Sequence, residues 1–559
     1  MIVDLDATAP EELPTYDLCI VGSGPAGTTV ANELKDAPFR VCVLESGRLR
    51  TTRRGDRLRA VSSEGLFIKE YSRERVLGGT STTWAGLSSP LDPADLAPRD
   101  WLRHSGWPIG LDELLPHYGE AAERYRFPPL SFFGREGFGE LRGKGDLQPP
   151  WEALDEKVFL ACAEPQNFGR EFRELYESPA VDLLIDATVQ RLEAEDGRIV
   201  AARVRTGGGK ELALRARAFV LATGGIENAR LLLVSRDLHT TGLGNQHDQV
   251  GRYFMNHPKN YSGILRLRKP VAEAPYFFGC LFQGYAGYAG LRLPEEVQRE
   301  RGLLNSYVRM EPLFPWSDNE GIESLVLFVK RTSFVLKRFR KKHEDEVVSL
   351  RDYSETGDDS DLQNERKSAL SWLGLLGKIA WNAPRVAQYL WYRLVPGAVP
   401  KIREVRVRNF MEMEPDPDNR VVLSAEKDED GKQLPHVESR CTALDQRSLT
   451  DLHAALAAEV ERAGLGELVT DLAEADPWPI TLDASHHIGT TRMGVDPATS
   501  VVTPDLSVHG ADNVYLAGGS VFPTSGCANP TFTIVALSIR LARHLRERFE
   551  QPAAEGGLA

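Results

Sequence analysis

The sequence predicts an α/β protein, α+β overall, in which a domain of strands and helices is joined to a second domain built on a largely antiparallel sheet with helices. Three observations support this prediction. A strand–glycine–helix–strand unit opens the chain, a second apolar strand ends in glycines near residue 220, and alternating strands occupy much of residues 259–475. With 559 residues, the chain has room for two domains.

The first unit has the pattern of a Rossmann-like, dinucleotide-binding fold. We expect a strand over Tyr16 to Val21, a helix from Thr28 to about Lys35, and a second strand over Arg40 to Leu44. A glycine turn in an ordinary βαβ unit is the alternative. The carboxylate of Glu45 at the end of the second strand favours the dinucleotide site, because it can hold ribose hydroxyls.

Three glycines between the first strand and the helix have distinct roles in such a site. Gly22 allows the tight turn, Gly24 lets the backbone approach a pyrophosphate, and Gly27 lets helix and strand pack closely. The helix N-terminus attracts the phosphates.

FAD and NAD share this fingerprint, and the loop over residues 75–86 favours FAD. It is rich in Gly and Thr, so it offers backbone N–H groups and hydroxyls to a flat polar ring, and Trp84 is expected to lie against another group. A surface loop is the alternative. The candidate cofactor contacts here are Gly78, Gly79, Thr80, Ser81 and Thr83.

A second crossover lies near the middle of the chain. The strand Phe219 to Leu221 runs through Ala222, a candidate cofactor contact, into glycines and a helix from Ile226. Further on, His257 could be catalytic, but a histidine before a proline is more often structural, which is the interpretation that we favour.

We expect the first domain to be discontinuous, at 1–90, 180–258 and 476–559, and the second to comprise 91–179 and 259–475. The second domain is predicted to form the roof of a substrate site. Its expected strands are Tyr261 to Leu267, Ser324 to Phe328, Ile402 to Met413 and Arg420 to Ser424.

An insertion over about residues 332–400 interrupts the roof. It has a basic run, an acidic stretch and an apolar segment, at 337–342, 352–365 and 372–395. The apolar segment carries Trp381 and Trp391, and the basic run beside these aromatic helices could touch a membrane surface or a partner. We favour a helical lid, since glycines and a proline break the apolar residues.

Two candidate sites lie near the C-terminus, at 485–494 and 526–531. Between them an apolar strand ends in Gly518 and Gly519, and a helical pattern follows over Phe532 to Leu545. The strand delivers the chain to a loop that holds Asn529. A histidine upstream could lie beside this loop and act as a base.

Together these motifs resemble the glucose–methanol–choline (GMC) flavoprotein oxidoreductases from Tyr16 to Leu545, except in the insertion and parts of the roof. The matching motifs are the glycine fingerprint with Glu45, the 78–81 loop, His486-x-x-Gly489-Thr490 and Gly526-x-x-Asn529-Pro530-Thr531. The chain looks most like the sugar-oxidising branch of pyranose oxidases and bacterial glycoside 3-oxidases, which has Asn where many members have a second His.

The resemblance implies FAD as cofactor and hydride transfer from the substrate carbon to flavin N5. It implies that His486 is the base and that Asn529 holds the forming alkoxide. We expect the neighbouring His487 to face away. Some pyranose oxidases attach FAD covalently through a histidine of the glycine-rich loop, and because Thr83 stands there, we expect non-covalent FAD. The cofactor contacts implied near the C-terminus are Gly518, Gly519, Asn529, Pro530 and Thr531.

Composition limits partners and location. The net charge of −13 argues against a nucleic-acid partner. Six scattered cysteines predict neither a disulfide framework nor a metal site. The acidic start lacks the apolar region of a secretory signal, and no run reaches the length of a membrane span, so we expect a cytoplasmic protein. It could form a homo-oligomer.

Three functions remain open from the sequence. The first is FAD-dependent oxidation of a secondary ring hydroxyl of a sugar or glycoside to a ketone. The second is a GMC-type oxidase or dehydrogenase of a non-sugar alcohol, such as a lipid or terpenoid, with the insertion's aromatic helices forming an apolar tunnel. The third is a flavin-binding subunit or scaffold. The sequence does not separate O₂ from a quinone or a protein as the electron acceptor.

Overall fold

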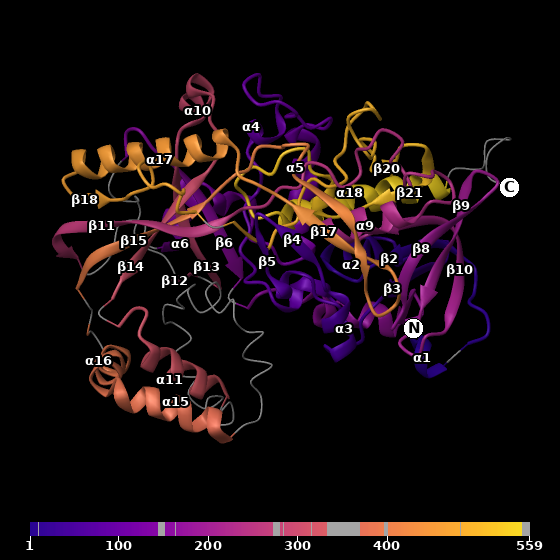
Figure 1. Cartoon of the computed structure of the whole chain (residues 1–559), viewed down its shortest axis with the longest axis horizontal. Coiled ribbons are helices and arrows are strands. Elements are labelled where there is room, and N and C mark those ends of the chain that lie inside the picture. Colours follow the sequence, from indigo (N-terminus) through magenta and orange to yellow (C-terminus); the bar gives the residue numbers. More distant parts are fainter. Residues whose placement is uncertain are drawn as a thin grey trace.

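The computed structural model describes residues 1–8, 10–142, 151–162, 164–271, 280–282, 284–314, 316–331, 369–395, 398, 401–480 and 482–550. Two sheets dominate it, one mostly parallel and one antiparallel (Figure 1). The mixed α/β fold class predicted from the sequence is therefore confirmed.

The larger sheet has nine strands, with the order β1-β7-β3-β2-β10-β21-β20 and a branch of β9 and β8 on β10. Its strands are β1 (Ile2–Asp4), β2 (Tyr16–Val21), β3 (Val41–Glu45), β7 (Val181–Ile185), β8 (Thr188–Glu195), β9 (Arg198–Arg205), β10 (Glu211–Leu221), β20 (Ser507–Val508) and β21 (Ala511–Leu516). The pairs from β1 to β21 along this order are parallel. Their carboxyl ends therefore share one edge, where ligands of open parallel sheets bind.

The predicted strand–helix–strand unit is present with one shift. The helix α2 spans Pro25–Glu33, so it begins three residues before the predicted Thr28. Proline suits the first helical position, because its missing N–H has no partner there. Strand β2 matches the prediction, and its last residue, Val21, pairs with Leu221 of β10, which in turn pairs with Leu516 of β21.

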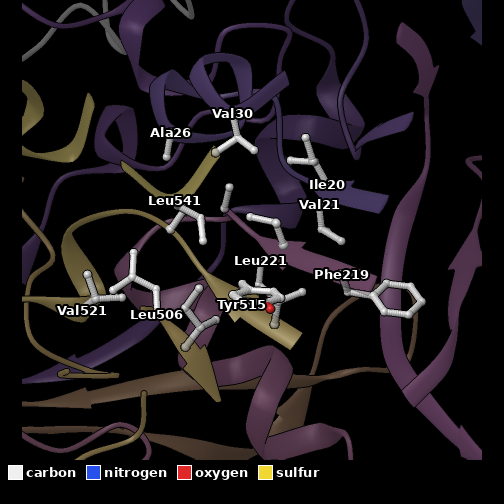
Figure 2. Close-up of a cluster of buried hydrophobic side chains, with 14 of the residues drawn as sticks. Ile20, Val21, Ala26, Val30, Phe219, Leu221, Leu506, Tyr515, Val521 and Leu541 are labelled. Atoms are coloured by element: carbon white, nitrogen blue, oxygen red, sulfur yellow. The ribbon is translucent and has the colours of Figure 1, made fainter. Parts of the chain in front are cut away.

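The core below this edge is apolar and joins distant segments. Helix α18 (Thr531–Glu550) packs on α2 and on α5 (Leu111–Arg124). Figure 2 shows Leu541 of α18 and Val30 of α2 in one cluster with Leu221 and Tyr515 of the sheet. This packing fixes the start of α18 near the carboxyl edge.

The second sheet has seven strands in the order β12-β13-β14-β15-β11-β18, with β6 paired to β13. They are β6 (Asp155–Cys162), β11 (Lys259–Val271), β12 (Cys280–Phe282), β13 (Tyr285–Arg292), β14 (Tyr307–Leu313), β15 (Ile402–Phe410) and β18 (Gly466–Val469). Each pair is antiparallel. Helix α17 (Ala443–Arg462) contacts β18 and begins with a capping box of Thr442 and Asp445.

One strand prediction is wrong, and one predicted strand lies in a different sheet. Residues 324–328 lie inside helix α11 (Glu320–Arg331), because a short apolar run does not distinguish a strand from a buried helix. The Asn319 side chain accepts the N–H groups of Gly321 and Ile322 at the start of this helix. Strand β16 (Arg420–Lys427) belongs to a separate sheet with β17 (Gln433–Glu438) and β4 (Ser62–Glu64), not to the roof.

Helix α11 forms a group with α15 (Ala369–Trp381) and α16 (Ala383–Leu394), set apart from the rest of the chain at the lower left of Figure 1. The apolar part of the predicted insertion is therefore helical. Its basic and acidic runs, at 337–342 and 352–365, lie outside the described residues. Among the helices of the described ranges, none is long and apolar enough to cross a bilayer.

The remaining helices are short: α1 (Leu5–Thr8), α3 (Arg53–Leu58), α4 (Pro93–Leu96), α6 (Arg135–Arg142), α7 (Phe168–Glu171), α8 (Arg173–Glu177), α9 (Gly225–Val234) and α10 (Glu295–Arg301). A two-stranded sheet joins β5 (Phe67–Ile68) to β19 (Asp483–Ala484). This pairing brings the segment before the glycine-rich loop beside the segment that leads to His486.

Candidate active site

A cavity with about 1370 Å³ of empty volume, part of it open to solvent, lies along the carboxyl edge of the parallel sheet. Its wall combines segments from the whole chain. It includes residues 21–26, 44–46, 72–75, 79–80, 187–189, 222–227, 485–487, 518–519 and 530–531. The glycine fingerprint and the C-terminal motifs therefore meet at one site.

The glycines of the first turn differ in what surrounds them. Gly22 has a φ of +104°, and a Cβ on Gly27 would lie 2.0 Å from the carbonyl oxygen of Gly22. Both positions are closely packed. A Cβ on Gly24 would meet nothing within 4 Å, and the same holds for Gly224 and Gly518, which also line the cavity. Bare backbone thus faces the cavity from three strand ends, which fits the approach of a pyrophosphate.

Glu45 lies at the end of β3 in the cavity wall and is 5% exposed. Its carboxylate accepts hydrogen bonds from the Ser23 hydroxyl at 2.6 Å, the Ser23 N–H at 3.2 Å and the Gly47 N–H at 2.7 Å. These bonds fix the carboxylate. A fourth hydrogen bond, from the Ser46 hydroxyl, is long at 3.5 Å, so a ribose hydroxyl would compete with this weak donor for the carboxylate.

The glycine-rich loop contributes only in part. Gly79 and Thr80 line the cavity, whereas Gly78, Ser81 and Thr83 lie outside its wall. The Ser81 hydroxyl donates to the Gly78 carbonyl at 2.6 Å and accepts from the Phe168 N–H at 3.0 Å. The Thr83 hydroxyl donates to the carbonyl of Tyr71 at 2.9 Å. In this structure both side chains stabilise the loop itself.

Arg73, just before this loop, was not among the residues predicted from the sequence. Its Nη2 donates to Glu227 at 2.7 Å, but its buried Nε and Nη1 have no hydrogen-bond partner in the described part of the chain. Because Arg73 lines the cavity, these donors fit an anionic or carbonyl acceptor of a bound cofactor. The sequence feature that could have identified Arg73 is its position shortly before a glycine-rich loop.

The C-terminal motifs bring four predicted contacts, Gly519 among them, and two histidines to the cavity wall. Gly518, Pro530 and Thr531 line it, and α18 begins at Thr531, so the positive end of a long helix lies at the wall. His486 and His487 both line it as well, and that the His487 ring faces away from a bound substrate stays a prediction. Nε2 of His487 lies 3.3 Å from the hydroxyl oxygen of Ser72. The sequence does not reveal this contact, because the two residues are far apart in the chain.

Asn529 lies beside the cavity without being part of its wall. Its Nδ2 donates to the carbonyl of Leu87 at 2.8 Å, which holds the amide in place. Within the described ranges its Oδ1 accepts no hydrogen bond. Ala222 and Gly519, two further predicted contacts, do line the cavity.

His257, expected to be structural, contacts the predicted base. It is 2% exposed, and its Nδ1 lies 2.9 Å from Nδ1 of His486. The preceding residue, Asn256, accepts the backbone N–H of His486 at 3.1 Å. Sequence spacing could not show this, because 229 positions separate the two histidines.

The histidines of the cavity are held neutral. Burial, with the positive charge of Lys259 nearby, lowers the pKa of His486 well below its usual value. Burial, with Arg73 nearby, lowers the pKa of His487 to about 3. A neutral imidazole at neutral pH can accept a proton, as a general base must.

Comparison with known proteins finds a matching family model and several relatives with named activities. A family model described as GMC oxidoreductase matches residues 415–538. The 6'''-hydroxyparomomycin C oxidase of Streptomyces lividus is 26% identical over 94% of this chain and 91% of its own length. The C-glycoside 3-oxidase of Microbacterium trichothecenolyticum is 37% identical over 22% of this chain and 24% of its own.

A solved structure extends the likeness to the fold of the whole chain. The pyridoxine 4-oxidase of Mesorbium loti superposes with a TM-score of 0.55 and 15% identity, and the match covers 95% of this chain and 99% of that one. At this identity the likeness concerns the fold alone.

Proposed function

Since this chain belongs to the GMC family of oxidoreductases, which are flavoproteins that use FAD and act on CH–OH groups, we propose that it oxidises a secondary ring hydroxyl of a sugar or glycoside to a ketone. One observation carries the proposal: His486 lines the same cavity as Gly24, Gly518 and the start of α18. A base, a pyrophosphate cradle and a helix N-terminus are thus in one site.

In the proposed reaction His486 accepts the proton of the substrate hydroxyl, and Asn529 orients the oxygen as its negative charge develops. Bound FAD supplies a two-electron acceptor for the hydride that leaves the carbon. The start of α18 at Thr531 stabilises negative charge at that end of the cavity. Gly22, Gly24, Gly27, Glu45 and Arg73 form the proposed binding site for the dinucleotide. With Thr83 in the glycine-rich loop, we propose that FAD is held without a covalent bond.

Polar surroundings of His486 support a sugar substrate. Lys259 and Lys69 lie close enough to affect the pKa of His486, and the Ser485 hydroxyl is 3.4 Å from the Lys259 ammonium. Such groups suit a substrate with several hydroxyls. The names of the two oxidases above also point to glycoside and aminoglycoside substrates.

The alternative of a non-sugar alcohol has weaker support. It depends on an apolar tunnel formed by the aromatic helices, but Trp381 is 88% exposed and Trp391 is 60% exposed. Both belong to α15 and α16, which Figure 1 shows apart from the parallel sheet. These tryptophans therefore do not line the cavity of His486.

A spectrum and a substrate panel test the proposal. We expect the purified protein to show flavin absorption and to release its flavin into the supernatant on acid precipitation. Under anaerobic conditions, methyl glucosides or an aminoglycoside should bleach the flavin, whereas long-chain alcohols should not. Bleaching by the long-chain alcohols alone would favour the alternative, and a protein that binds no FAD would refute the proposal.

The lowered pKa of His486 predicts the pH dependence of the reaction. The unprotonated imidazole is the active form, so kcat/KM falls only when the pH drops below the pKa of His486 in the folded protein. Because burial and Lys259 lower this pKa, we expect kcat/KM to stay level from pH 8 to below 6.5, the ordinary value. Flavin reduction measured across this range tests it, and an acid limb at or above pH 6.5 would contradict it. Lys259→Met removes a positive charge near His486, so it should raise the pKa of His486 and shift the acid limb of the profile to higher pH.

A further inference from the structure

His257 is enclosed between a carbonyl oxygen and the proposed base. It lies two residues before the start of β11 and is almost fully buried. Its Nε2 is 2.9 Å from the carbonyl oxygen of Gly526, and its Nδ1 is 2.9 Å from Nδ1 of His486. The two rings are nearly perpendicular, at 87°.

These contacts permit one arrangement of protons on two neutral rings. A carbonyl oxygen only accepts, so Nε2 of His257 must carry its proton and donate to Gly526. Nδ1 of His257 then bears a lone pair and accepts. The proton in the contact between the rings must come from Nδ1 of His486. Nε2 of His486 is consequently left with its lone pair.

The reverse arrangement is unfavourable. A proton on Nδ1 of His257 would leave the lone pair of its Nε2 facing the Gly526 oxygen at 2.9 Å, where two acceptors repel each other. A doubly protonated ring is also disfavoured, because burial and the charge of Lys259 lower the pKa of His257 to about 4. Each ring therefore carries one proton at neutral pH.

The neighbouring residue holds the backbone of the same base. Oδ1 of Asn256 accepts the N–H of His486 at 3.1 Å and the N–H of Ser485 at 3.3 Å. Met255 and Ile488 add an antiparallel bridge beside them. Residues 255–257 thus fix the main chain and the ring of His486, and Nε2 of His486 makes no hydrogen bond within the described ranges.

We propose that His257 is a positioning residue that fixes His486 in the tautomer with the proton on Nδ1, so that Nε2 is the atom that accepts the substrate proton. The role in proton transfer rests on the proposed function, whereas the tautomer does not. Orienting partners of this kind affect activity by about 10- to 100-fold.

A pair of variants separates positioning from packing. Asparagine at 257 keeps an acceptor near the place of Nδ1, whereas phenylalanine fills the space without one. We expect His257→Phe to lower kcat for flavin reduction by about 10- to 100-fold with little change in KM, and His257→Asn to recover most of the rate. Equal losses in both variants, or wild-type kcat in His257→Phe, would overturn the role. Thermal unfolding and FAD content show whether each variant folds.

The tautomer is measured on the wild-type holoenzyme without substrate. In protein labelled with ¹⁵N-histidine, long-range ¹H–¹⁵N correlations distinguish protonated from unprotonated ring nitrogens, and His486→Gln assigns the signals. We expect Nδ1 of His486 to be protonated and Nε2 to be unprotonated. The opposite pattern would overturn the inference even if the enzyme oxidises sugars. Absence of turnover on every alcohol would instead refute the proposed function.

Discussion

Replacement of His486 by alanine is expected to slow flavin reduction by about 10²- to 10⁴-fold, the contribution of a positioned general base. The variant should still bind FAD, because the glycine turn and Glu45 lie elsewhere in the cavity wall. Stopped-flow reduction by a saturating glycoside measures the rate constant, and flavin absorbance measures occupancy.

His487→Ala is the matched control. It removes an adjacent imidazole from the same wall, but this ring lies beside Ser72 and has no contact with His257 among the described residues. We expect a much smaller loss of rate than in His486→Ala. Equal losses would indicate a general disturbance of the cavity, and a larger loss in His487→Ala would transfer the role of base to His487.

The sequence predicted the local parts of the fold well, because their signals lie within a few residues. Strand β2 and the glycine turn are specified by an apolar run and by residues that only a tight turn requires. The start of α2 was misplaced because a proline was counted with the turn, although it suits the first position of a helix. The run at 324–328 carried no periodic signal long enough to identify a helix.

Long-range contacts were beyond the sequence. The glycine-rich loop was predicted to offer backbone N–H groups and hydroxyls to the cofactor, and the sequence does not reveal that the hydroxyls of Ser81 and Thr83 donate to neighbouring backbone carbonyls. Likewise, a histidine before a proline carries no mark of its partner, and the contact from His257 to His486 exists only after two distant segments pair. The sequence shows which hydroxyls and imidazoles are available for a site. It does not show which groups they contact, because those contacts form only when distant segments pack together.

Alanine at two glycines of the fingerprint should affect different properties. Gly27→Ala should lower the stability of the apoprotein, and Gly24→Ala should weaken the binding of FAD. In Gly27→Ala the new methyl would lie 2.0 Å from the Gly22 carbonyl, so backbone must move. We expect a loss of about 3 kcal/mol or more in the free energy of unfolding of the apoprotein. Gly24 has an extended backbone that any residue adopts, and its new methyl would meet no atom within 4 Å. Its apoprotein should therefore unfold as the wild type does.

The methyl of Gly24→Ala would instead occupy the space in which we place the pyrophosphate. Overpacking of about 1–3 kcal/mol there corresponds to roughly 5- to 150-fold weaker binding of FAD. Urea unfolding of both apoproteins and titration with FAD separate the two effects. Wild-type affinity in Gly24→Ala would mean that the pyrophosphate does not lie over this turn. An unfolded Gly24→Ala would show that the open space above Gly24 is closed in solution.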